Sequence, residues 1–272
     1  MRHDLPRFDA PVPWLRRHLL LAAAAAGLSG CSRQESAPAA QATGRAVDDP
    51  TLLAAGMLLP GLVNSSTDGT LIDLVREMGQ HYSRGPIVIN AFPVARVLES
   101  SAQGVIDLGF PWMRATTADG GRSPYRCSTE PYGRVNFVLY SNRRKPVTRA
   151  LIEQQLRQGH MDLTIEAPAF DWRFPYQQFI NFESAFRKLI AGRLDALLWA
   201  QEEADLVLRQ MQLSDIRREN YGDFDDVFLL PPGPRGDAVD RIVTDTLGKL
   251  RQSGRLQALY RRIHLPHDPW QP

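Results

Sequence analysis

The 272-residue sequence has only two cysteines, Cys31 and Cys127. Two thiols are too few for a disulfide framework or for a four-cysteine zinc site. The sequence also lacks a lysine- and arginine-rich block. Four of its 32 basic and two of its 30 acidic residues lie in residues 1–31, which leaves 28 of each sign beyond them. A neutral body without a basic patch argues against nucleic acid as a partner.

Several catalytic and cofactor signatures are missing as well. There is no Gly-x-Ser-x-Gly elbow, no phosphate-binding glycine loop and no dinucleotide fingerprint. The pair His264 and His267 has no nearby glutamate to complete a metal site. Cys127 with a distant histidine is a possible thiol nucleophile, but a buried cysteine is usually inert. We therefore predict no metal, no cofactor and no catalytic residue, and we expect a protein that is not an enzyme.

The first 31 residues have the order of an export signal. Basic residues end at Arg16-Arg17, an apolar run follows, and the segment closes with Leu28-Ser29-Gly30-Cys31. The run is shorter than the ~20 residues of a spanning helix, and no later run reaches that length. The segment resembles a bacterial lipoprotein signal, and the alternative is an uncleaved helical anchor.

The lipoprotein resemblance implies cleavage before Cys31 and a lipid, such as palmitate, on its thiol. It also implies a periplasmic protein held at a membrane, and Ser32 favours the outer membrane. Residues 32–50 are small, polar and aperiodic, so we predict a flexible tether there.

Apolar spacing predicts an alternation of helices and strands beyond the tether. Leu71, Leu74, Val75 and Met78 recur at helical spacing, and residues 87–89 form a short buried strand in this interpretation. A helix after Pro93 and a strand over residues 105–110 follow. The second half of the apolar run 52–64 also suggests a strand. This alternation favours an α/β fold with a mainly parallel sheet.

One local pattern occurs twice. Gly104 and Gly192 each end a predicted helix, and each is followed three residues later by an aspartate at the start of a strand, Asp107 or Asp195. A repeat after 88 residues indicates two α/β lobes of similar design rather than a short-period solenoid.

The order of the segments resembles the type 2 periplasmic solute-binding proteins, in particular the polar amino-acid receptors of ABC transporters (family 3). Six segments carry this resemblance: residues 68–74, 93–110 (PVARVLESSAQGVIDLGF), 128–132 (STEPY), 182–196 (FESAFRKLIAGRLDA), 227–233 (VFLLPPG) and 239–263. It implies a two-lobed fold with lobe 1 at 51–139 plus 225–272 and lobe 2 at 140–224. Each lobe would hold a mainly parallel sheet flanked by helices, and the two crossing strands would act as a hinge over a ligand cleft.

The resemblance also suggests ligand-binding residues. Amino-acid receptors of this family bind the α-carboxylate through an arginine about ten residues before the tyrosine of their "PY" element. Arg122 occupies that position relative to Tyr132, and Arg114 competes with it. A guanidinium fits a carboxylate with two hydrogen bonds. Further candidates for ligand contacts follow the predicted strand ends, namely Trp112, Tyr132, Asn64 and Ser65.

Two departures weaken the match to a standard amino-acid receptor. The position of the aspartate that holds the α-ammonium is Ala200, and Gln201, Glu202 or Glu203 is the nearest substitute. The Gly-Thr pair of the family is replaced near Glu166. We expect a monomer that binds a small polar solute, anionic or amino-acid-like, for an ABC permease. The alternatives are a sensor or accessory lipoprotein, and a dehydratase with Glu166 or Glu202 as general acid.

Overall fold

The computed structural model describes residues 45–116 and 121–272. Cys31, Ser32, the predicted signal and most of the predicted tether lie outside these residues. The described strands are β1 (Leu52–Met57), β2 (Ile87–Phe92), β3 (Leu108–Ala115), β4 (Gly133–Asn142), β5 (Ile165–Ala167), β6 (Gln177–Gln178), β7 (Ala196–Ala200) and β8 (Ile216–Leu229). The described helices are α1 (Thr70–His81), α2 (Val94–Ala102), α3 (Arg149–Arg157), α4 (Phe182–Ile190), α5 (Gln201–Met211), α6 (Gly233–Gln252) and α7 (Arg255–Ile263).

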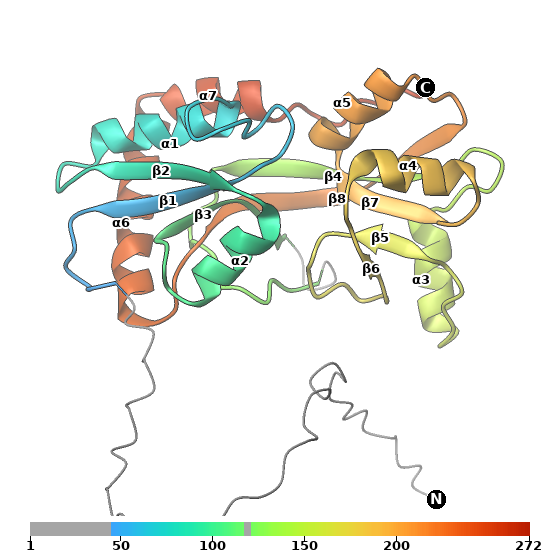
Figure 1. Ribbon diagram of the computed structural model, residues 1–272, viewed down its shortest axis with the longest axis horizontal. Helices are drawn as coiled ribbons and strands as arrows, with labels where there is room; N and C mark the ends of the chain where they lie inside the picture. The colour runs from blue at the N-terminus through green and yellow to red at the C-terminus, as the bar shows by residue number, and fades with distance from the viewer. Residues whose placement is uncertain (1–44, 117–120) are drawn as a thin grey trace, which may run out of the picture. The chain divides into compact units, whose positions relative to one another are not determined.

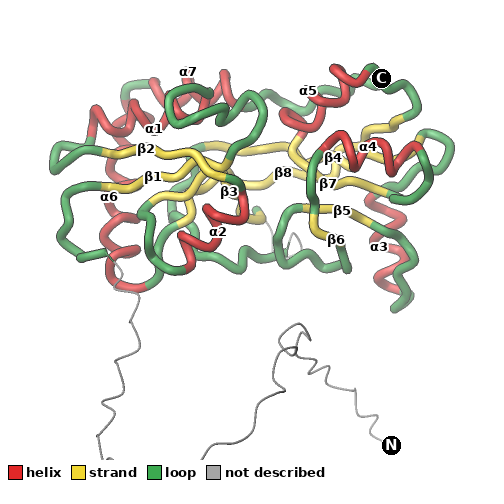
Figure 2. Tube along the Cα trace, in the orientation of Figure 1, coloured by secondary structure: helices red, strands yellow, loops and turns green. Residues whose placement is uncertain are grey.

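The strands form one mixed sheet in the order β2-β1-β3-β8-β4-β7-β5-β6 (Figure 1). At one end β1 pairs in parallel with β2 and β3, and at the other end β5 pairs in parallel with β6 and β7. We call β1–β3 with α1, α2, α6 and α7 the first half. We call β5–β7 with α3, α4 and α5 the second half. Figure 2 shows helices beside the strands of both halves.

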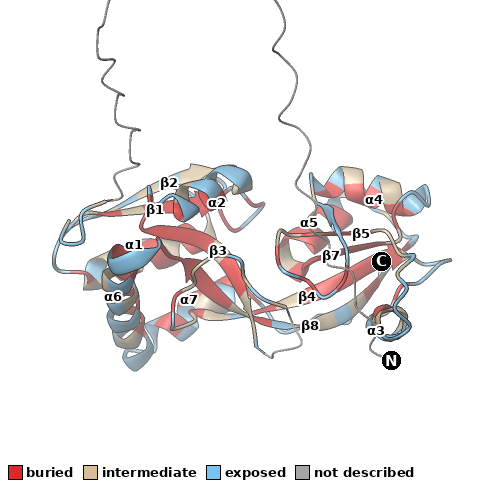
Figure 3. Ribbon diagram, turned by 90° about the horizontal axis from the view of Figure 1, so that it is seen from below, coloured by how far each residue is buried: buried red, intermediate tan, exposed pale blue. Residues whose placement is uncertain are grey.

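Strands β4 and β8 join the two halves. They pair antiparallel with each other over nearly the whole of β4, while β8 also pairs with β3 and β4 also pairs with β7. Figure 3 shows both strands running from one group of helices to the other. The predicted lobe boundaries, at 139/140 and 224/225, fall inside these two strands. A hinge at this place stays a prediction.

The repeated Gly-x-x-Asp pattern adopts the same local structure and makes the same kind of hydrogen bond in each half. Gly104 and Gly192 have φ angles of 70° and 66°, in the left-handed region that glycine enters without steric cost. Asp107 accepts a hydrogen bond from the backbone N–H of Leu53 at 2.8 Å, and Asp195 accepts one from that of Thr164 at 2.9 Å. Each aspartate therefore ties the start of its strand to the neighbouring parallel strand.

The structure corrects three expectations. The apolar run 52–64 is a strand in its first half, β1, because Pro60 and Gly61 turn the chain in its second half. Strand β2 lies at the sheet edge, so every second residue faces outward, and Val88 is 42% exposed. Residues 45–50 belong to the folded body rather than to the tether, since Arg45 contacts the carboxylate of Asp107 at 3.0 Å.

The core is apolar and follows the helical and strand periodicities. In α1 the buried side chains include Leu71, Leu74, Val75 and Met78, as their spacing predicts. Strands β1, β3 and β7 are largely buried (Figure 3). None of the described helices combines the length and the apolar character needed to cross a membrane.

Candidate functional site

A cavity of about 880 Å³ lies where the two halves face each other. We call it the central cavity. Its walls are mostly apolar and come from both halves: Met57, Leu98 and Trp112 from the first, Ala167, Phe182 and Trp199 from the second. The crossing strands contribute Phe137 and Asp226. A concave, mainly apolar space with a few polar groups is the usual form of a small-molecule site.

The charged side chains that line the central cavity are Glu183, Glu203, Asp226 and His264. No lysine or arginine of the described residues is among the lining residues. Glu183 is exposed at the start of α4, whereas the other three are almost completely buried. The polar floor of the cavity is therefore acidic, with one imidazole.

His264 holds this floor together. It directly follows α7, and its Nε2 lies 2.8 Å from Oδ2 of Asp226 on β8. On the other side of the ring, Nδ1 lies 3.0 Å from Oε1 of Glu202. Burial alone would lower the pKa of His264, but the charges of Asp226 and Glu202 outweigh it and raise the pKa well above its ordinary value. His264 is therefore a cation held between two carboxylates.

Glu203 is the carboxyl group of the floor that forms no ion pair among the described residues. It is 3% exposed, and among the described residues its Oε2 has no hydrogen-bond partner. Burial, together with the neighbouring charge of Glu202, raises the pKa of Glu203 to about 8. The carboxyl group accepts a hydrogen bond from its own backbone N–H, so one of its oxygens is left unpaired in the cavity wall. A buried polar atom without a partner is uncommon in folded proteins and makes Glu203 a candidate for a functional role.

Local structure explains why these groups meet. Strand β7 ends at Ala200 and α5 begins at Gln201, so Glu202 and Glu203 lie in the first turn of α5. The positive end of the helix dipole favours carboxylates there. Asp226 lies on β8 opposite Gly133 of β4, and its neighbour in β3 is Met113.

One predicted ligand residue, Trp112, lines the central cavity. Its indole Nε1 donates to Oγ of Ser123 at 2.8 Å, which fixes the ring. The contact between Trp112 and a solute stays a prediction.

The two candidate arginines do not line the cavity. Arg114 donates to the backbone oxygen of Ser128 at 2.8 Å and pairs with Asp225 at 2.9 Å. The backbone of Arg122 forms an antiparallel bridge with Asp171. The structure thus brings neither guanidinium to the acidic floor, and their role as a carboxylate clamp is an untested prediction.

The other candidates also lie outside the cavity lining. Tyr132 is 2% exposed and packs on Phe228 with 4.8 Å between the ring centres. Asn64 and Ser65 occupy a turn, where Asn64 donates to Asp68 at 2.7 Å and Ser65 accepts from Thr67. The Gln201 side chain binds the end of the chain, as described next.

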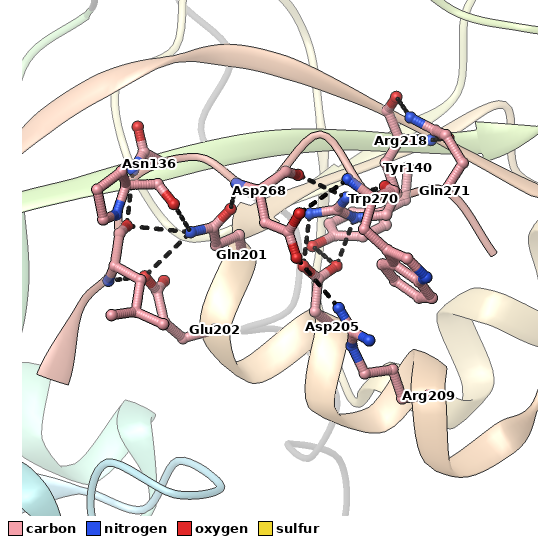
Figure 4. Close-up of polar contacts among 12 residues, drawn as sticks. Asn136, Tyr140, Gln201, Glu202, Asp205, Arg209, Arg218, Asp268, Trp270 and Gln271 are labelled. Atoms are coloured by element: carbon pink, nitrogen blue, oxygen red, sulfur yellow. Dashed lines mark hydrogen bonds and ion pairs between the residues drawn. The ribbon is translucent and has the colours of Figure 1, made fainter. Parts of the chain in front are cut away.

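The C-terminal residues 265–272 run from α7 of the first half to the second half, where the chain ends beside α5 (Figure 1). Figure 4 shows the polar contacts that Asp268, Trp270 and Gln271 make there. Gln201 donates to the backbone oxygens of Leu265 and Pro266 and accepts from the N–H of Asp268. Arg218 donates to the backbone oxygens of Asp268 and Trp270.

The same arginine also anchors a buried network. Arg218 pairs with Asp205 on α5, and the Tyr140 hydroxyl donates to Asp205 at 2.8 Å (Figure 4). Arg209 stacks over the Trp270 ring at 3.7 Å. Residues 265–272 thus supply hydrogen-bond acceptors and an aromatic ring to Gln201, Arg218 and Arg209 of the second half.

The residues suggested for catalysis have structural partners. Glu166 is 1% exposed and accepts from Nζ of Lys188 at 2.6 Å, outside the cavity lining. Burial raises the pKa of the Cys127 thiol, which is opposite to the activation that a nucleophile needs. No group of three or more histidine, cysteine, aspartate or glutamate side chains in the described part of the chain is arranged to hold a metal ion.

Sequence reasoning named Glu203 only as a substitute and missed Asp226 and His264. Asp226 is a polar residue next to the apolar run VFLL, a signal of a buried charge within a strand. For His264 the sequence offers no such signal, because its partners lie 38 and 62 residues away along the chain.

No family model matches the chain, and no curated protein matches it in sequence. The fold is similar to those of three solved structures, among others. One is the GluR0 ligand-binding core from Nostoc punctiforme in complex with L-glutamate (15% identity, TM-score 0.56, covering 79% of this chain and 100% of that one). The second is a histidine kinase sensor domain with similarity to periplasmic binding proteins (14% identity, TM-score 0.58, covering 78% of this chain and 95% of that one).

The third is an ABC uptake transporter substrate-binding protein from Streptococcus pneumoniae with bound histidine (15% identity, TM-score 0.54, covering 79% of this chain and 93% of that one). At such low identity these likenesses show the fold. The expected α/β fold of the periplasmic binding proteins, with flanking helices, is confirmed. The parallel pairings expected for each lobe lie at the two ends of one mixed sheet.

Proposed function

We propose that this protein is an extracytoplasmic solute-binding protein that captures a small, amino-acid-like molecule in the central cavity. The observation that carries the proposal is the cavity itself, since one space of about 880 Å³ is walled by both halves of the sheet. A molecule held there contacts both halves at once. Such a site binds a guest by closing on it, and it needs no chemistry.

The location is part of the proposal. A lipid on Cys31 would hold the folded body at a membrane, with residues 32–44 as the connecting tether. Metabolic labelling with a fatty-acid analogue tests this, because Cys31→Ser should abolish the label while Cys127→Ser should leave it. Label that persists in Cys31→Ser would refute the anchor.

The proposed partner is an ABC permease that accepts the solute. A signalling role is the second candidate, favoured by the likeness to a histidine kinase sensor domain. Both roles use the same cavity. Uptake of a radiolabelled solute in cells with and without the gene separates them, because a sensor would change gene expression and leave initial uptake unchanged.

The solute class needs revision in one respect. The sequence favours an anionic or amino-acid-like solute, but the lining of the central cavity has no lysine or arginine to receive an anion. The amine of an amino-acid-like solute, in contrast, finds carboxyl groups at the floor. We therefore keep the amino-acid-like solute and give up the requirement for a net negative charge.

Ligand-induced stabilisation tests the proposed function directly. The purified protein is heated with amino acids, organic acids, amines and polyamines, one at a time. A ligand that binds the folded state at about 100 times its Kd adds about 2.7 kcal/mol to the stability. At least one solute should raise the Tm in proportion to the logarithm of its concentration. A Tm that responds to none of them would contradict the proposal.

A further inference from the structure

The charges around the central cavity are unbalanced. Three carboxyl groups, of Glu202, Glu203 and Asp226, surround one imidazole, that of His264. If all four were ionised, the floor would carry a net charge of −2. Electrostatic interactions act strongly between these groups because the surrounding walls are apolar.

Two of these carboxylates already have a cation. Asp226 and Glu202 lie on the two sides of His264 at 2.8 and 3.0 Å. Glu202 also accepts from the backbone N–H of Leu265 in the C-terminal tail (Figure 4). These two carboxylates are therefore already paired within the protein, and they hold the imidazole in place.

Glu203 forms no such ion pair among the described residues, and its carboxyl group accepts a hydrogen bond from its own backbone N–H. It lines the cavity, it is 3% exposed, and Oε2 has no hydrogen-bond partner in the described part of the chain. Burying an ionised carboxylate without a counterion costs several kcal/mol. Without a bound cation, Glu203 avoids this cost by retaining its proton, which agrees with its pKa of about 8.

The cavity that Glu203 lines has several aromatic rings in its walls. Trp112, Phe137 and Trp199 line the cavity from the first half, the crossing strands and the second half. Phe179 packs on Trp199 with 4.1 Å between the ring centres and also lines the cavity. Aromatic faces attract alkylammonium groups and favour apolar bodies of the same molecule.

We propose that the central cavity binds an organic cation with an apolar body, a hydrophobic amine or quaternary ammonium ion, and that Glu203 is the carboxylate that receives its charge. The inference rests on the proposed solute-binding function and specifies its ligand class. The cation supplies the counterion that Glu203 lacks, and the apolar body fills the aromatic walls. An anion would instead meet an acidic floor and no free basic group of the lining.

A matched series of ligands tests the charge preference. Phenylethylammonium, 2-phenylethanol and phenylacetate share one ring and differ in charge. Isothermal titration of the purified protein near pH 7 should give the ammonium ion an affinity at least about tenfold above that of either analogue. Equal or tighter binding of the alcohol or of the carboxylate would overturn the proposal.

Two matched variants locate the receiving group. Glu203→Gln keeps the shape and removes the charge, so it should weaken binding of phenylethylammonium about tenfold or more and leave 2-phenylethanol within about twofold. Glu99→Gln is the control, because Glu99 on α2 is exposed and lies outside the cavity lining, where solvent screens its charge. Unchanged cation binding in Glu203→Gln would overturn the assignment.

Proton release gives a readout that does not depend on a variant. The groups that face Glu203 are Glu202, Asp226, His264 and Tyr132. Benzyltrimethylammonium has no proton of its own, so a proton released on its binding must come from the protein. Titration near pH 7 in two buffers of different ionisation heat should show release of close to one proton, and Glu203→Gln should abolish it.

The same linkage fixes the pH dependence. Glu203 is mostly protonated near pH 7 and mostly ionised near pH 9, so the affinity for benzyltrimethylammonium should rise roughly tenfold over this range. A flat profile, or one that Glu203→Gln leaves unchanged, would contradict the role of Glu203.

The failure of this inference can be told from the failure of the proposed function. If amino acids or organic acids stabilise the protein while no cation of the series binds, the ligand class is wrong and solute binding stands. If neither group of ligands binds, both proposals fail.

Discussion

Glu203 and His264 share one buried, acid-rich site but keep their protons for different reasons. Glu203 is protonated because the cavity offers its charge no partner, whereas His264 is protonated because two carboxylates flank it. The folded protein therefore binds both protons more tightly than the unfolded chain.

The stability of the ligand-free protein should fall as pH rises from about 5 to 8, with Glu203 as one cause. The folded-state pKa of about 8 lies above the ordinary value of 4.5 for a glutamate, so the unfolded chain binds fewer protons than the folded one in this window. The raised pKa of His264 acts in the same direction above its ordinary value of 6.5. Urea unfolding at several pH values gives the free energy of unfolding as a function of pH. This free energy should fall less steeply with pH in Glu203→Gln than in the wild type. An identical slope would contradict the buried, protonated carboxyl.

Arg218 is the residue on which the buried network of the second half depends. Its side chain is 0% exposed and pairs with Asp205, while its guanidinium also binds the C-terminal tail. Arg218→Met should lower the free energy of unfolding by about 3–5 kcal/mol, because Asp205 is left without its cation. Adding Asp205→Leu removes the stranded charge and should recover part of the loss in denaturant titrations. No recovery would show that the tail contacts, rather than the charge pair, carry the effect.

The elements show which part of the structure local sequence determines. The apolar spacing in α1, the start of α2 after Pro93 and the glycines that end α2 and α4 are local signals, and they predict these three helices correctly. The exposure of β2 depends on its place at the sheet edge, which the sequence of β2 alone does not contain. The acidic floor needs the start of α5, the middle of β8 and the end of α7 in one place. The position of Trp112 after a predicted strand is a local signal, so the sequence predicts it as a site residue. Asp226 and His264 are brought to the site only by the fold, so the sequence does not predict them.

The two copies of the Gly-x-x-Asp pattern should differ in their contribution to stability. Asp107 is 0% exposed and also contacts Arg235 at 2.7 Å and Arg45 at 3.0 Å. The side chain of Asp195 is 15% exposed, and its partner Lys145 is 76% exposed. Asp107→Ala should therefore cost about 3–5 kcal/mol, because two arginines lose their counterion. Asp195→Ala should cost about 1–2 kcal/mol, the value of a lost backbone hydrogen bond. Chemical denaturation ranks the two, and equal losses would contradict this account.

At the scale of the whole molecule, the crossing strands and the C-terminal tail connect the two halves. Strands β4 and β8 run from one half to the other with one shift of register between Phe137 and Val138, and residues 265–272 lead from α7 to α5 and β8. The central cavity is the space that these connections leave between apolar walls. The proposed solute binding depends on both halves contributing to this one site.

The most direct test of a site shared by both halves is to fill the cavity from each side in turn. Ala95 on α2 of the first half and Ala169 in the second half both line the cavity without being fully buried, so a larger side chain can be placed at either position. Ala258 on α7 is exposed and outside the lining, and Ala258→Trp is the control. Isothermal titration is done with the solute that stabilises the wild type. Ala95→Trp and Ala169→Trp should each weaken binding about tenfold or more, and the control should not. Unchanged affinity in both cavity variants would contradict the account, and loss in only one of them would place the site on a single half.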